Sequence, residues 1–196
     1  MKKFFKLFII IFIVSVNFFN VNALDTQSLL IDYQNIIDEI NEEYQTHLYI
    51  LSETEFIQSP IYNDYDNNYS NYINNILQTD IDTFKSDCLK IVNVQTIYDY
   101  QINHMTRSTL GKKTMSFNNN CNSMTLTYKH NGSKFDTSYK PTATVAKLAN
   151  SNYFVMSSYT GTFKNSNATY TVSAKGKIYS RYGTASNKTF VVNFNL

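Results

Sequence analysis

Residues 170–181 read Tyr-Thr-Val-Ser-Ala-Lys-Gly-Lys-Ile-Tyr-Ser-Arg, and apolar and polar side chains largely alternate along them. This period of two is typical of a β-strand, because successive side chains of a strand point to opposite faces of its sheet. One face of the predicted strand is apolar. The other face carries three cations and an aromatic ring, Lys175, Lys177, Tyr179 and Arg181.

The same alternation recurs through the rest of the C-terminal half. Strand-like stretches cover residues 114–118, 124–129, 141–148, 153–163 and 189–196. Residues 182–186 form a hairpin loop between the last two strands, and Asn- and Ser-rich turn signals separate several of the others. Six or seven antiparallel strands with short turns predict a small barrel or, preferably, a β-sandwich of immunoglobulin-like architecture.

The N-terminal half has a different rhythm, in which apolar residues recur at steps of three and four. One such seam runs from Leu30 to Leu51, and a second runs from Ile73 to Met105. Ser59-Pro60 and the polar residues 63–68 lie between them and favour a turn. The pattern predicts an antiparallel hairpin of two long helices, each about 50 Å in length. The predicted fold class is therefore α+β, a helical hairpin followed by the β-sandwich.

Charge divides at the same place as the hydrophobic period. The chain of 196 residues has a formal net charge of +2. Residues 24–104 hold fourteen carboxylates and two lysines, a net of −12, whereas residues 105–196 hold twelve cations and one carboxylate, a net of +11. A surface of one sign attracts groups of the opposite sign. The basic half is therefore expected to contact an anionic partner or to be neutralised by the acidic helices.

The N-terminus has the features of a secretory signal peptide. Lys2, Lys3 and Lys6 precede an apolar run over residues 7–16, and Val21-Asn22-Ala23 has the spacing of a cleavage site. The run is too short for a membrane span, which needs about 20 apolar residues. We expect a signal peptide over residues 1–23, an acidic helical region over residues 24–106 and a basic β-sandwich domain over residues 107–196. The mature protein is expected to be secreted, without stable membrane insertion.

Two cysteines, Cys88 and Cys121, make up the cysteine content of the chain. Export would place them in an oxidising compartment, where a disulfide between them is permitted. The alternative is a pair of free thiols, because Cys88 falls on the second helical seam and Cys121 lies among asparagines. The sequence leaves both states open.

Motifs for catalysis and metal binding are missing from the sequence. It contains no Gly-rich phosphate loop, no G-x-S-x-G and no H-E-x-x-H pattern, and glycine occurs five times in all. His47, His104 and His130 do not have the spacing of metal ligands. We therefore predict no catalytic residues, no metal site, no cofactor and no enzymatic activity.

The basic strand face is the candidate binding site, through Lys175, Lys177, Tyr179 and Arg181. Flexible cations beside aromatic rings suit anionic polymers. The preferred hypothesis is an exported binding protein that contacts an anionic polymer of a bacterial cell envelope, or a surface protein, and does not bind nucleic acid. Self-assembly through the helical seams into a homo-oligomer is an alternative. A hydrolase without a recognisable motif is a third reading.

Overall fold

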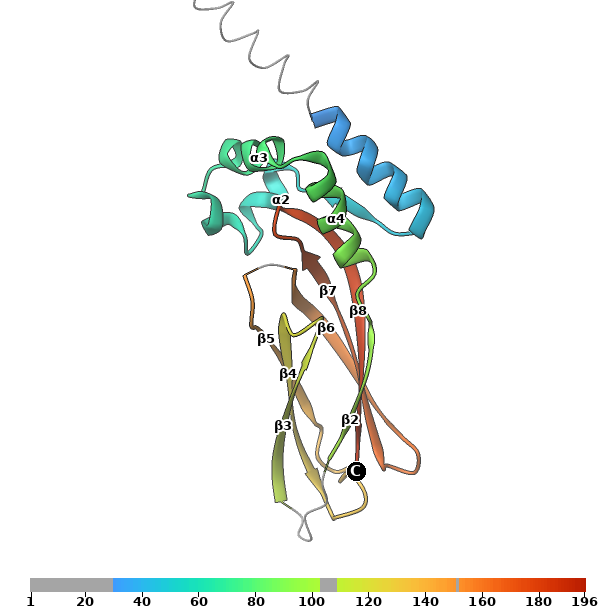
Figure 1. Ribbon diagram of the computed structural model, residues 1–196. Helices are drawn as coiled ribbons and strands as arrows, with labels where there is room; N and C mark the ends of the chain where they lie inside the picture. The colour runs from blue at the N-terminus through green and yellow to red at the C-terminus, as the bar shows by residue number, and fades with distance from the viewer. Residues whose placement is uncertain (1–29, 103–108, 151) are drawn as a thin grey trace, which may run out of the picture.

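The computed structural model describes residues 30–102, 109–150 and 152–196 (Figure 1). Two β-sheets form an elongated body, and short helices cap one end of it. Residues 30–44 are helical. The other elements, in chain order, are β1 (Leu48–Ile50), α2 (Glu53–Ile57), the 3-10 helix η1 (Tyr62–Tyr65), α3 (Tyr69–Gln78), α4 (Ile81–Val92), β2 (Ile97–Gln101), β3 (Thr109–Phe117), β4 (Asn122–His130), β5 (Thr142–Lys147), β6 (Tyr153–Lys164), β7 (Thr169–Tyr179) and β8 (Thr184–Asn195).

Sheet A contains five strands, in the order β1-β8-β7-β6 with β2 also beside β8. The long strands β6, β7 and β8 are antiparallel neighbours. β1 runs antiparallel to the start of β8, and β2 runs parallel to its end, so both short strands share one edge of β8. The N-terminal half of the chain therefore supplies two strands of the sheet that the C-terminal half builds.

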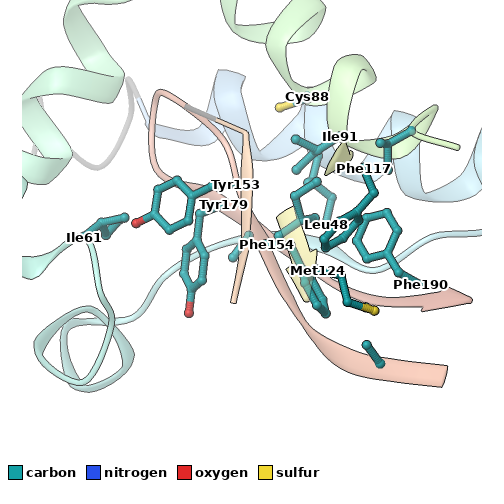
Figure 2. Packing of buried hydrophobic residues seen from close by; sticks show 14 of the residues in the cluster. Leu48, Ile61, Cys88, Ile91, Phe117, Met124, Tyr153, Phe154, Tyr179 and Phe190 are labelled. Atoms are coloured by element: carbon teal, nitrogen blue, oxygen red, sulfur yellow. The ribbon is translucent and has the colours of Figure 1, made fainter. Parts of the chain in front are cut away.

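Sheet B contains three antiparallel strands in the order β3-β4-β5. It packs on sheet A through buried aromatic rings. Phe117 of β3 lies edge-on to Phe190 of β8, with ring centroids 5.0 Å apart, and to Phe154 of β6, at 6.2 Å. Figure 2 shows Phe117, Phe190 and the buried Met124 of β4 gathered in this interface. The six strands predicted between residues 114 and 196 are confirmed as β3 to β8, although β8 begins earlier than expected.

The predicted hairpin of two long helices is wrong, and its first seam ends near Gln45. Gln45 has φ +50°, outside the helical region, and residues 48–50 form β1. Ser52 then starts α2 with a capping box, in which the Ser52 side chain accepts from the Glu55 N–H and the Glu55 side chain accepts from the Ser52 N–H. These two signals cut the three-and-four spacing into a helix, a strand and a second short helix.

The second predicted helix is also divided. Thr79 is extended, and the Asp80 carboxylate caps α4 by accepting from the Thr83 N–H, so α3 and α4 are separate helices. Ile81, which the seam placed inside, is 43% exposed. Further along, Tyr98 belongs to β2 and pairs with Val192 of β8. The chain is therefore mainly β, with two sheets and short helices in place of a helical hairpin followed by a sandwich.

The short helices pack on the sheets and share one continuous hydrophobic core with them. The Tyr72 hydroxyl of α3 donates to the Gly183 carbonyl at 3.0 Å, and the Lys188 ammonium of β8 donates to the Val92 carbonyl at the end of α4, at 2.9 Å. The buried apolar residues form a single cluster that extends from Tyr33 to Phe194. We call the elements between residues 48 and 92 the helical cap, because they cover one end of the two sheets.

Asparagine shapes many of the tight turns, because the chain has few glycines. Asn118, Asn119 and Asn120 all have positive φ in the turn between β3 and β4, and Asn165 and Asn167 do so between β6 and β7. Asparagine tolerates this left-handed region better than most residues with a side chain. The Asn-rich turn signals of the sequence thus mark real reversals of the chain.

Two predictions lie outside the described residues. The signal peptide at residues 1–23 falls before residue 30, and the boundary between residues 106 and 107 falls in the segment 103–108. They stay predictions. Among the helices that the structure describes, none is long and apolar enough to cross a membrane.

Candidate functional site

The four residues of the predicted binding face lie in two different places. Lys175, Lys177 and Tyr179 follow each other at alternate positions of β7, the middle strand of the three long strands of sheet A. Arg181 lies beyond the end of β7, in the turn before β8, where its guanidinium is 5.7 Å from the centre of the Tyr182 ring. The structure therefore brings the first three together and leaves Arg181 outside the group.

A groove of about 440 Å³ opens over these residues on the outer face of sheet A. β7 forms its floor, and β6 and β8 form its sides. It is lined by Val155, Ser157, Lys175, Gly176, Lys177, Tyr179, Asn187, Lys188 and Thr189. We call this the lysine groove, because three of these residues are lysines. The lining side chains offer ammonium, hydroxyl and amide donors, which suit an anionic ligand.

The strand register orders the groove into cross-strand rows. Lys177 lies between Val155 of β6 and Asn187 of β8, and Lys175 lies between β6 and Thr189 of β8. Directly paired residues of neighbouring strands point to the same face of a sheet. The two ammonium groups therefore project on the same side, with polar side chains from β8 beside them.

Lys177 is held at the end of the groove by the helical cap. Its ammonium lies 3.6 Å from a Glu55 carboxylate oxygen of α2 and 5.4 Å from the centre of the Tyr49 ring of β1. Hydrogen bonding to Tyr49 and the Glu55 charge raise the pKa of Lys177. The capping hydrogen bonds with Ser52 lower the pKa of Glu55 and fix its carboxylate. Both charges are partly exposed, so the pair contributes little to stability.

Lys188 pairs with Gly176 of β7, so its side chain leaves sheet A on the face opposite to Lys175 and Lys177. Its ammonium donates to the Val92 carbonyl, at the C-terminus of α4, where the helix dipole favours a cation. Burial lowers the pKa of Lys188. The other lysines that could extend the patch do not reach the groove: Lys129 and Lys147 belong to sheet B, and Lys164 ends β6 at its far end.

Tyr179 is a buried floor residue and not an exposed contact. Its ring stacks on Tyr153 of β6 with ring centroids 5.8 Å apart, and Figure 2 shows the two rings side by side. Burial raises the pKa of Tyr179. Its exposed fraction is 5%, so a ligand would contact the edge of this ring at most.

The outer face of sheet A continues past the groove as a polar ladder. The Thr171 hydroxyl of β7 donates to the Asn193 carbonyl oxygen of β8, and the Asn193 amide donates to the Asp99 carboxylate of β2, both at 2.9 Å. One row further along, the Thr169 hydroxyl donates to the Asn195 side chain, also at 2.9 Å. Thr169 and Thr171 are buried, whereas Asn193 and Asn195 are partly exposed, so the amide groups of β8 are the accessible part of this ladder.

The two cysteines lie away from the groove. Both are free thiols. The Cys88 thiol is buried against Thr184, and burial raises its pKa to about 12. Cys121 is partly buried in the turn after β3, where desolvation also raises its pKa. A thiol with a raised pKa is a poor nucleophile at neutral pH.

Sequence reasoning missed Tyr49 and Glu55, which do not line the groove but contact Lys177 at its end. They come from the N-terminal half and reach the groove only because β1 and α2 lie at the end of β7 and β8. In the described parts of the chain, no group of three or more metal-ligating side chains lies close together. The site is thus a basic groove with one nearby carboxylate from Glu55.

Comparison with known proteins adds no functional assignment. No protein-family model matches the chain, and no curated protein matches it. Among solved structures, it is similar to a two-domain protein of unknown function from Bacteroides thetaiotaomicron, with 11% sequence identity and a TM-score of 0.27. That match covers 75% of this chain and 67% of the other. A likeness this weak carries no argument about fold or function.

Proposed function

We propose that this chain is an exported, non-enzymatic binding protein whose lysine groove holds an anionic group of a cell-envelope polymer. The observation that carries the proposal is the placing of Lys175 and Lys177 side by side over one groove, with Glu55 as the carboxylate within ion-pair distance of Lys177. A net positive charge remains in the groove after that pair is counted. Two ammonium groups over one concave surface attract phosphate or carboxylate groups.

A polymer of polyol phosphate fits the chemistry of the outer face best. The ammonium groups of the lysine groove suit a phosphate, whereas the partly exposed amide groups of Asn193 and Asn195 suit a polyol. The ladder begins at Thr171, two rows from Lys175 along β7. An extended chain that alternates phosphate and polyol units can therefore contact the lysines of β7 and the asparagine amides of β8.

Serine replacement of the two β7 lysines tests the site. With poly(glycerol phosphate) as probe, K175S/K177S is expected to weaken binding about tenfold at low salt, because two charge contacts are lost. A matched variant, K112S/K134S, removes two exposed lysines outside the groove, and we expect less than about a twofold change. Calorimetric or anisotropy titrations give both dissociation constants. Equal losses in the two variants reject the groove as the site.

Salt dependence tests the electrostatic basis of the same binding. Raising the NaCl concentration from about 0.05 M to 0.5 M shortens the Debye length about threefold, so the affinity of the wild-type chain should fall steeply. An affinity that stays constant over this range excludes charge attraction as the main contribution.

Removing the nearby carboxylate is expected to strengthen binding. Glu55→Gln frees Lys177 from its ion pair, and glutamine still fits the third position of a capping box, so α2 keeps its start. The expected gain in affinity for poly(glycerol phosphate) is about threefold. Glu53→Gln on the same helix is the control, since it removes an equal charge without that pair. A gain that is the same for both variants shows only a general effect of net charge.

The self-assembly alternative loses its structural basis. It required two continuous helical seams, and the structure divides both of them at Gln45 and at Thr79-Asp80. Ile37 and Ile40 of the first seam and Phe84 and Cys88 of the second are buried within the chain's own core. They are therefore not available to a second copy.

A further inference from the structure

One side of the two-sheet body ends in two strands that do not pair with each other. β5 is the outer strand of sheet B, and β6, which follows it in the chain, is the outer strand of sheet A. At the start of β6, the Asn122 side chain takes the place of a neighbouring strand. Its oxygen accepts from the Phe154 N–H at 2.7 Å, and its amide donates to the Phe154 carbonyl at 2.8 Å. Beyond Phe154, the Asn122 side chain makes no further hydrogen bonds to β6 in the described part of the chain.

The outer edge of β6 over residues 155–163 is free of strand partners within the described residues. Peptide groups alternate in direction along a strand, so about half of those in this stretch point away from β7. The stretch also lacks the charges and prolines with which proteins protect a free edge. Its one irregularity is a bulge between Met156 and Ser158. Such an edge can accept a further strand.

Two hollows lie along this edge, one on each side of the bulge. The first, of about 350 Å³, is lined by Pro60, Val145, Lys147, Tyr153, Phe154, Val155 and Met156. The second, of about 570 Å³, is lined by Thr137, Lys140, Pro141, Tyr159, Thr160, Gly161, Phe163 and Tyr170. Phe154 and Phe163 are nine residues apart, or about 30 Å in a strand. An added strand of about ten residues would reach both hollows with its inward side chains.

The positive charges around the edge of β6 favour an acidic binding partner. Lys147 lines the first hollow and Lys140 the second, and neither lining includes a carboxylate. Lys164 adds a third cation at the end of β6. A second copy of this chain would bring its own lysines to the same edge, where like charges repel. An acidic segment is attracted instead.

We propose that the edge of β6 binds an extended, acidic segment of a partner protein, which adds to sheet A as a further strand. The peptide groups of the segment pair with β6, and its alternate apolar side chains enter the two hollows. Acidic residues near its ends meet Lys140 and Lys147. This site uses the free edge of β6, whereas the lysine groove lies on the outer face of sheet A; Val155 lines both, but the two sites use different lysines, so either proposal can fail without the other.

A designed peptide tests this proposal. The probe is a blocked eleven-residue peptide in which valine alternates with threonine and two aspartates stand at each end. At millimolar concentration, we expect it to slow the hydrogen exchange of amides within residues 155–164 of the full chain. Unchanged exchange in this stretch, with protection elsewhere or nowhere, overturns the proposal.

Methylated peptides separate strand pairing from other contacts. N-methylation of every valine blocks one edge of the peptide strand, and N-methylation of every threonine blocks the other edge. One of the two kinds of N-methylated peptide should bind at least about thirtyfold more weakly than the parent peptide, and the other should bind less than about threefold more weakly. Equal effects of the two sets contradict the addition of a strand.

Charge reversal tests the preference for an acidic partner. The K140E/K147E variant is expected to weaken peptide binding about tenfold, because the two lysines that line the hollows become repulsive. The K112E/K134E variant reverses two exposed lysines elsewhere, and it should change binding less than about twofold. Equal effects show that the edge has no selectivity for acidic segments and overturn that part of the proposal.

Discussion

Replacement of Tyr72 by alanine is expected to lower the free energy of unfolding by about 3–5 kcal/mol, the usual cost of truncating a large buried aromatic residue. Tyr72 is fully buried in α3. Its ring stacks on Phe56 with ring centroids 5.0 Å apart and lies edge-on to Tyr65 at 5.5 Å. The substitution therefore leaves a cavity at the centre of the helical cap.

Tyr72 also joins the helical cap to sheet A. Its hydroxyl accepts from the Leu51 N–H at 2.9 Å and donates to the Gly183 carbonyl at 3.0 Å. Gly183 has φ +91°, and a Cβ atom there would lie 2.1 Å from the Tyr72 ring. The turn before β8 thus needs glycine both for its backbone conformation and for the approach of this ring.

Chemical denaturation of three chains measures this contribution. Tyr72→Phe keeps the ring and loses two buried hydrogen bonds, so we expect it to cost about 1–3 kcal/mol. Tyr69→Ala truncates a neighbouring, partly exposed ring and should cost less than Tyr72→Ala. A loss below about 1 kcal/mol for Tyr72→Ala contradicts the role of this residue in joining the two parts.

Replacement of Asn122 by leucine is expected to lower the free energy of unfolding by about 2–4 kcal/mol, although the two side chains are similar in size. Asn122 is fully buried at the start of β4. Leucine leaves the N–H and carbonyl of Phe154 without their partner. It also removes a bond to the Ala146 carbonyl of β5 and a bond from the Asn118 amide. A buried peptide group without a partner carries its full desolvation cost.

The exposed Asn150 provides the control, since Asn150→Leu should change stability by less than about 0.5 kcal/mol. Denaturant midpoints give the stability of both variants. Amide hydrogen exchange at Phe154 adds a local readout, because this amide should exchange faster in the Asn122→Leu variant than in the wild type. A variant as stable as the wild type shows that Asn122 does not hold the two sheets together.

The C-terminal strands were predictable because each carries its own alternation. In β7, for example, Val172, Ala174 and Ile178 face the core, and the polar residues between them face outward. Lys175 and Lys177 follow directly from this period. Arg181 does not, because the strand ends at Tyr179 and the chain turns before β8. An alternation alone does not say where a strand stops.

The apolar spacing of the N-terminal half predicted two long helices that the structure does not contain, although the sequence holds local signals of the helix ends. Ser52 is followed three residues later by Glu55, the pattern of a capping box, and Asp80 is a good N-cap residue. Apolar steps of three and four continue across these breaks by coincidence. Capping residues inside a seam should therefore outweigh the spacing of its apolar residues.

The contacts around Lys177 at the end of the groove could not be predicted from local sequence patterns. Tyr49 and Glu55 lie far from Lys177 in sequence, and they meet it because β1 pairs with the start of β8. Three residues of β-strand carry too little period to be recognised, and the pairing of distant strands depends on the packing of the whole chain. Among the described residues, the ion pair of Glu55 and Lys177 joins the acidic half of the chain to the basic half.

The central claim, that anionic polymer binds at the lysine groove, is tested most directly by observing each lysine. Reductive methylation with ¹³C-formaldehyde gives every lysine its own NMR signal, which single Lys→Arg variants assign. On addition of poly(glycerol phosphate) we predict that the signals of Lys175 and Lys177 shift, while those of Lys112 and Lys134 stay in place. Unmoved Lys175 and Lys177 signals, or shifts of equal size at all four lysines, would contradict the claim.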